Sequence, residues 1–124
     1  MDARQRDALG RNAEHHALAW LRKAGLALVT RNFRIRHGEI DLVMQDGECL
    51  VFVEVRFRGR TAFDDAAGSV DGRKQRRLAR AADAFLARRA RWQHSPVRFD
   101  VVAINATANG TLSVDWIQDA FRPA

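Results

Sequence analysis

The chain has 124 residues, of which 47% are hydrophobic, and this length and composition predict a single globular domain, residues 1–124. Its single cysteine excludes an intramolecular disulfide and a Cys-rich zinc site. No apolar run approaches the roughly 18 residues of a membrane span, and the charged first residues lack a signal core, so we expect a cytoplasmic protein without a membrane partner. The net charge of +6, from 19 Arg and two Lys against 15 acidic residues, is equally compatible with a nucleic-acid partner and with a basic protein that has none.

The first half of the chain predicts a helix followed by three strands. Apolar residues recur every three or four positions from Ala3 to Ala24, which indicates an amphipathic helix with Trp20 in the core. The strands are predicted over Leu26–Ile35, from Gly38 through Met44, and from Cys49 to Phe57. Alternation in the second strand places Ile40, Leu42 and Met44 on one face and Glu39, Asp41 and Val43 on the other. Asp46-Gly47 is a tight-turn signal, so the second and third strands are expected to form an antiparallel hairpin.

The second half predicts a loop, a helix and two more strands. Arg58 to Ser69 lacks periodicity, and Asp71 is a suitable N-cap for a helix from Gly72 to Arg91. Strands are predicted over Val97–Ile104 and Thr111–Ile117, joined by a turn at Asn109-Gly110. The element order is therefore α-β-β-β-α-β-β, which predicts an α/β fold with a central mixed five-stranded sheet flanked by helices. The crossover through the second helix requires one parallel strand pair.

Two carboxylates in the predicted hairpin indicate a site for chemistry. Twelve residues separate Asp41 from Glu54, and folding at the turn brings their strands to within about 5 Å of each other. A carboxylate among apolar strand residues is costly to bury unless it is paired or bound to a metal. Mg²⁺ prefers oxygen ligands, and the two carboxylates with the backbone carbonyl of Val55 would supply them. Arg56 would then orient a water molecule or stabilise charge in the transition state.

A structural role explains the same carboxylates without any chemistry. Asp41 or Glu54 would then form a buried ion pair, and the candidate partners are Arg56, Arg34 and Arg98. The sequence leaves both interpretations open.

Several segments of the chain resemble a known family. The segments are Arg31-Asn32-Phe33-Arg34, Gly38-Glu39-Ile40-Asp41-Leu42-Val43, Val51-Phe52-Val53-Glu54-Val55-Arg56, Arg98-Phe99-Asp100-Val101-Val102 and Ala120-Phe121. They are similar to those of the bacterial YraN-like family in the PD-(D/E)xK nuclease superfamily, which includes Holliday junction resolvases. The resemblance extends from about Gly10 to Phe121, nearly the whole chain.

This resemblance implies a restriction-endonuclease-like fold and a Mg²⁺- or Mn²⁺-dependent nuclease that acts on DNA, including branched or junction DNA. Asp41 and Glu54 occupy the metal-ligand positions of the family pattern. Glu14 falls where resolvase-like members carry a further acidic residue, and Glu39 is the acidic residue of the Gly-Glu-Ile-Asp segment. Because resolvases act on symmetric junctions, a homodimer would suit this activity.

One residue departs from the superfamily pattern. The position two residues after the motif glutamate is usually Lys, whereas this chain has Arg56, which stays protonated. Lys74, at the start of the second helix, is an alternative source of an amine in the same cleft. The departure also favours a second hypothesis, a non-catalytic nucleic-acid-binding protein on a nuclease scaffold.

Further arginines are candidates for contacts with nucleic acid. Arg58 and Arg60 follow the third predicted strand, next to the carboxylates. The second predicted helix carries Arg73, Arg76, Arg77 and Arg80. Such a series of arginines is typical of phosphate-backbone contacts, although a solvated helix face has the same pattern.

Overall fold

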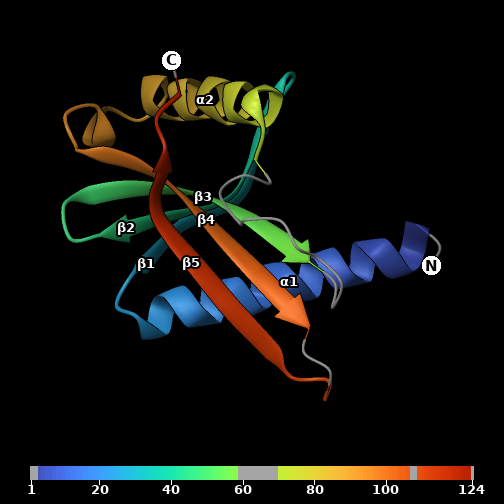
Figure 1. Ribbon diagram of the computed structural model, residues 1–124. Helices are drawn as coiled ribbons and strands as arrows, with labels where there is room; N and C mark the ends of the chain where they lie inside the picture. Colours follow the sequence, from blue (N-terminus) through green and yellow to red (C-terminus); the bar gives the residue numbers. More distant parts are fainter. Residues whose placement is uncertain (1–2, 59–69, 107–108, 124) are drawn as a thin grey trace.

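The computed structural model describes residues 3–58, 70–106 and 109–123, which form a five-stranded sheet between two helices (Figure 1). The elements are α1 (Ala3–Lys23), β1 (Ala27–Ile35), β2 (Gly38–Asp46), β3 (Cys49–Arg58), α2 (Gly72–Ala87), a short 3-10 helix (Ala90–Trp92), β4 (Val97–Ala106) and β5 (Leu112–Phe121). This order and the α/β class confirm the fold expected from the sequence, which is consistent with a restriction-endonuclease-like architecture. Arg60 and residues 59–69 of the predicted loop lie outside the described residues.

The strands are ordered β1-β2-β3-β4-β5 across the sheet. All neighbouring strands are antiparallel except β3 and β4, which run parallel because α2 crosses between them. The predicted turns are also present, since Gly47 and Gly110 adopt positive φ angles of 59° and 84° at the ends of the β2–β3 and β4–β5 hairpins. The first residues of β2 therefore lie beside the last residues of β3, near the centre of the sheet.

Each face of the sheet packs against one helix (Figure 1). On one face, Phe52 of β3 and Phe85 of α2 are fully buried, and their rings meet edge to face with centroids 5.8 Å apart. On the other face, Val51 and Val53 pack with Ala17 and other buried residues of α1. The predicted alternation along β3 is therefore confirmed. Glu54, two residues after Phe52, lies on the same face of the strand and faces α2.

Alternation along β2 differs from the prediction at Asp41. Leu42 and Met44 belong to the cluster against α1, whereas Ile40 packs in the α2 cluster together with Val43. The pairing of β2 with β3 ends at Leu42 and Val53, whereas its pairing with β1 continues to Gly38. Asn32 of β1, opposite Asp41, takes a positive φ of 53°, so the sheet is irregular where the change of face occurs. The prediction that Ile40 shares a face with Leu42 is therefore wrong.

Trp20 was expected in the core but is 45% exposed, and this expectation is wrong. It lies beside the fully buried Leu21 on α1, at the border of the apolar stripe, where helical spacing alone does not separate buried from exposed positions. No helix among residues 3–58, 70–106 and 109–123 has the length and apolar character needed to cross a bilayer.

Two predicted boundaries also differ. Helix α2 ends at Ala87 rather than Arg91, and the 3-10 helix that follows buries Trp92. Strand β5 continues past Ile117 to Phe121 because its register shifts between the Val101–Ile117 and Phe99–Phe121 pairs. Asp119 takes a positive φ of 50° within this irregular stretch, which lets the strand resume its pairing.

Gly38 allows the β1–β2 hairpin to approach α2 closely. A Cβ atom at Gly38 would overlap the carbonyl oxygen of Arg77 and lie 3.1 Å from the amide nitrogen of Ala81. Because both atoms belong to the helix backbone, a side-chain adjustment would not relieve the overlap. The absence of a side chain at Gly38 thus allows the turn that contains Arg36 and His37 to lie against the helix.

Candidate functional site

Asp41 and Glu54 lie next to each other at the point where β2 and β3 separate. Leu42 and Val53 form the last backbone pair of the two strands, and Asp41 and Glu54 are the next residues along them. There, Oδ2 of Asp41 accepts a hydrogen bond of 2.8 Å from the backbone N–H of Val55. The side chain of Asp41 thus replaces a backbone ladder bond, which fixes its carboxyl group beside β3.

The two carboxyl groups are half-buried and perturb each other. Burial and the charge of Glu54 raise the pKa of Asp41 to about 8, despite the opposing hydrogen bond from Val55. Burial also raises the pKa of Glu54, although the positive charge of Arg56 opposes this effect. The hydrogen bond between the two side chains raises the pKa of Asp41 further and lowers that of Glu54.

Glu14 reaches the same site from α1. It is half-buried, and its negative charge adds to the effects that raise the pKa of Asp41. The structure therefore brings together three of the predicted acidic residues: Glu14, Asp41 and Glu54.

A small pocket opens on the α2 side of Glu54. Its volume is about 110 Å³, and it is lined by Glu39, Glu54, Arg56, Lys74, Arg77 and Leu78; we call it the carboxylate pocket. A guanidinium nitrogen of Arg56 lies 3.7 Å from Oε1 of Glu54, and the charge of Lys74 lowers the pKa of Glu54. Sequence analysis suggested that Lys74 faces this cleft, and the structure places it there.

The candidate ion pairs of the structural interpretation are formed only in part. Arg34 lies 3.6 Å from Glu39, and Arg98 pairs with Asp46 and Asp100 rather than with either site carboxylate. Arg56 is the remaining candidate, and its separation from Glu54 is long for an ion pair. Among the described residues, Asp41 forms no ion pair.

The donor set fits a hard divalent cation. Burial raises the pKa of both carboxyl groups, and the charge of Glu54 raises that of Asp41 further; a bound positive charge would offset these effects. Mg²⁺ commonly uses one or two carboxylates together with water and substrate oxygens. In the described part of the chain, no group of three or more His, Cys, Asp or Glu side chains is arranged to hold a metal, so a closed protein cage is not present there. Asp41, Glu54 and the backbone of Val55 would provide an open site.

The predicted nucleic-acid residues divide into two groups. Arg73, Arg76, Arg77 and Arg80 lie on α2 and line a second pocket, to which Arg36 and His37 also contribute. Arg36 and His37 are not predictable from the sequence, because the contact between their turn and α2 is long-range and the only local signal of a close approach is the adjacent Gly38. Arg58 is the last residue of β3, and Arg60 lies outside the described residues.

The unusual pKa of Asp41 predicts a characteristic dependence of stability on pH. Between the ordinary pKa of 3.8 and about 8, the folded protein holds a proton that the unfolded chain releases, so the free energy of unfolding falls as pH rises. Asp41→Asn removes this titration and keeps a hydrogen-bond acceptor for Val55. We expect the variant to gain stability relative to the unmodified protein, by a few kcal/mol between pH 5 and pH 8.

Urea denaturation in EDTA at pH 5, 6.5 and 8 measures this difference. Parallel pH profiles for the two proteins would contradict the assignment.

Comparison with known proteins identifies relatives along most of the chain. The model of "Uncharacterised protein family UPF0102" matches residues 13–104. A UPF0102 protein of Stutzerimonas stutzeri is 51% identical over 113 residues, which cover 91% of this chain and 93% of the relative. Those of Pseudomonas entomophila and Alcanivorax borkumensis are 49% and 47% identical, over 91% and 95% of this chain and 92% and 94% of theirs. These matches agree with the YraN-like resemblance, and the chain therefore belongs to the UPF0102 family.

Proposed function

We propose that this protein is a metal-dependent nuclease that hydrolyses phosphodiester bonds of DNA, including branched or junction DNA. The observation that carries this proposal is the Asp41–Glu54 pair, in which two half-buried carboxyl groups lie next to each other where β2 and β3 separate, with that of Asp41 held by the Val55 amide. Burial of two neighbouring carboxyl groups destabilises the metal-free protein, and such perturbed pairs are typical of functional sites, here one that binds a cation. The basic surface on α2 beside the site supports a polyanionic substrate.

Each side chain has a role that follows from its position. Asp41 and Glu54 would hold Mg²⁺ or Mn²⁺ with the backbone carbonyl of Val55, and Glu14 would add negative charge beside Asp41. The metal, when bound, would polarise the phosphodiester and lower the pKa of a water molecule. Arg56 and Lys74, which line the carboxylate pocket, would stabilise the negative charge that develops on the phosphate oxygens.

The roles of the remaining pocket residues are more limited. Arg56 cannot accept a proton, whereas Lys74 carries an amine that can exchange one. Glu39 pairs with Arg34 at the edge of the pocket and would help to position the cations there.

Two measurements test the proposal directly. The purified protein is incubated with branched, single-stranded and duplex DNA in the presence of Mg²⁺ or Mn²⁺, and Mn²⁺ is titrated calorimetrically into the DNA-free protein. We expect cleavage of at least one substrate and one saturable Mn²⁺ site. Absence of both cleavage and binding would reject the proposal.

Arg56 supports a second candidate function, a nucleic-acid-binding protein that has lost catalysis. The two candidates predict different results for substitutions at this position. For an active enzyme, Arg56→Lys should keep most of the activity, and Arg56→Gln should lower kcat by about 100-fold because a charge-stabilising donor is lost. An inert unmodified protein, combined with cleavage by Arg56→Lys, would favour the second candidate instead.

A further inference from the structure

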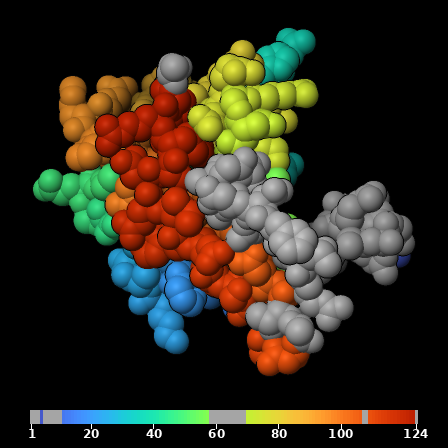
Figure 2. Space-filling model, in the orientation of Figure 1, coloured from blue at the N-terminus to red at the C-terminus, as the bar shows by residue number. Residues whose placement is uncertain are grey.

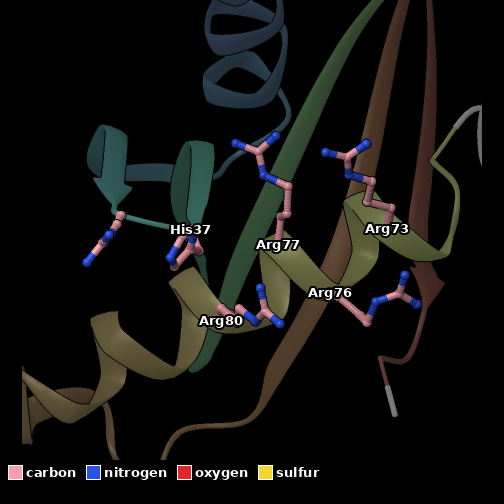
Figure 3. A pocket seen from close by; sticks show the side chains of 6 residues that line it. His37, Arg73, Arg76, Arg77 and Arg80 are labelled. Carbon is pink, nitrogen blue, oxygen red and sulfur yellow. The ribbon is translucent and has the colours of Figure 1, made fainter.

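A second pocket, about 220 Å³ in volume, is lined almost entirely by arginine. Its residues are Arg36, His37, Arg73, Arg76, Arg77 and Arg80, and we call it the arginine pocket. Figure 3 shows Arg73, Arg76, Arg77 and Arg80 along α2, with His37 of the β1–β2 turn beside them, and Arg36 of the same turn also lines the pocket. The hairpin turn and the start of α2 also lie side by side on the molecular surface (Figure 2).

The arginines of this pocket have no acidic partners among the described residues. Four arginines elsewhere in the described part of the chain do have such partners, since Arg34, Arg56, Arg98 and Arg122 each lie 3.0–3.7 Å from a carboxylate oxygen. Five exposed guanidinium groups around one cavity make the local potential strongly positive, which favours a bound anion. The close approach at Gly38 places Arg36 and His37 of the hairpin beside the arginines of α2.

The chemistry of the pocket favours a doubly charged phosphate over an internal phosphodiester. Each guanidinium presents five N–H donors in a planar fork that matches phosphate oxygens. An internal phosphodiester offers one negative charge and two free oxygens, whereas a phosphate monoester carries a charge of about −1.5 to −2 and three strongly accepting oxygens. Five arginines grouped in a concavity therefore match the monoester better.

Arg77 connects this pocket to the candidate catalytic site. It lines both the arginine pocket and the carboxylate pocket, so the two pockets are neighbours on α2. A nucleic-acid strand with a phosphate in the arginine pocket can therefore extend directly toward the carboxylate pocket.

We propose that the arginine pocket binds the terminal phosphate monoester of a nucleic-acid strand, whose adjoining nucleotides run toward Asp41 and Glu54. This inference rests on the proposed nuclease function and specifies its substrate as a strand with a phosphorylated end. Free phosphate and nucleotides share the same chemistry, so the test must separate them from a strand end.

The experiment compares single-stranded oligonucleotides of one sequence that carry a 5′-phosphate, a 3′-phosphate or hydroxyls at both ends. Binding is measured by fluorescence anisotropy in EDTA, with the dye placed internally, and inorganic phosphate and ADP serve as free competitors. The Arg36→Ala/Arg80→Ala double variant changes the arginine pocket but not the carboxylate pocket. Arg11→Ala/Arg22→Ala, on the exposed surface of α1, is the control with the same change in charge.

We expect one phosphorylated oligonucleotide to bind at least about 10-fold more tightly than the hydroxyl-ended one, as one added charge-assisted hydrogen bond would produce. The pocket variant should lose this preference, and the α1 control should keep it. Equal affinity for all three oligonucleotides would overturn the proposal, even if phosphate or ADP bound to the pocket. Retention of the preference by the pocket variant would overturn it as well.

The outcome is independent of hydrolysis. Cleavage without a preference for phosphorylated ends would leave the nuclease function intact and reject the terminal-phosphate site. A preference without cleavage under any metal would support the site and count against the nuclease.

Discussion

Asp41→Asn and Glu54→Gln are each expected to lower metal-dependent cleavage by at least about 100-fold. Each substitution removes a carboxylate oxygen that would hold the cation, and a bound metal supplies several kcal/mol of transition-state stabilisation, of which about 1.4 kcal/mol corresponds to tenfold in rate. Asn at position 41 preserves the acceptor for the Val55 amide, so the local backbone should stay in place. The measurement is kcat at saturating DNA, accompanied by calorimetric titration with Mn²⁺.

Glu48→Gln is the matched control because Glu48 is an exposed carboxylate in the β2–β3 turn. It removes the same charge from the same hairpin and should leave cleavage and Mn²⁺ binding unchanged. If Asp41→Asn and Glu54→Gln retained full activity, the assignment of the metal ligands would be wrong. A loss of cleavage with unchanged Mn²⁺ affinity would likewise contradict their role as ligands.

Asp100→Ala is expected to lower the free energy of unfolding by about 3–5 kcal/mol, because it removes one of the two carboxylate partners of Arg98 and leaves two further N–H donors without an acceptor. Asp100 is the one buried charged residue among those that the structure describes. It accepts hydrogen bonds from Nε of Arg98 at 3.0 Å, from the indole of Trp116 at 2.9 Å and from the amide of Asp119 at 2.9 Å. These bonds link β4 to the irregular part of β5.

Urea denaturation followed by tryptophan fluorescence measures the loss. Asp83→Ala on the exposed surface of α2 serves as the control and should change stability by less than about 0.5 kcal/mol. A loss below about 1 kcal/mol for Asp100→Ala would show that the network contributes little to folding.

The sequence predicts the sheet well because its signals are local. The Asp46-Gly47 turn determines the pairing of Leu42 with Val53, and that pairing brings Asp41 and Glu54 together. The parallel pair of β3 and β4 follows from the crossover helix. A family resemblance added Glu14, which periodicity alone would have treated as an ordinary polar helix residue.

Features that depend on contacts between distant segments were not predictable. The change of face between Ile40 and Leu42 arises where β2 leaves β3, and no residue in the strand marks that position. Trp20 lies at the border of its helical stripe, where a small rotation decides its exposure. The sequence indicates a row of arginines on α2, but the hairpin that encloses them lies more than thirty residues earlier in the chain.

The close approach at Gly38 determines which substitutions the arginine pocket can tolerate. The backbones of the hairpin and α2 approach each other at a residue without a side chain, and the lining residues Arg36 and His37 lie outside that contact. Exchange of Arg36 or His37 would therefore alter the affinity or selectivity of the pocket without inserting a group between the hairpin and the helix. A single methyl group at Gly38, in contrast, would force the two walls apart and change the reach between the two pockets on α2. Gly38 thus influences the distance that a bound nucleic-acid strand must span between the arginine pocket and the carboxylate pocket.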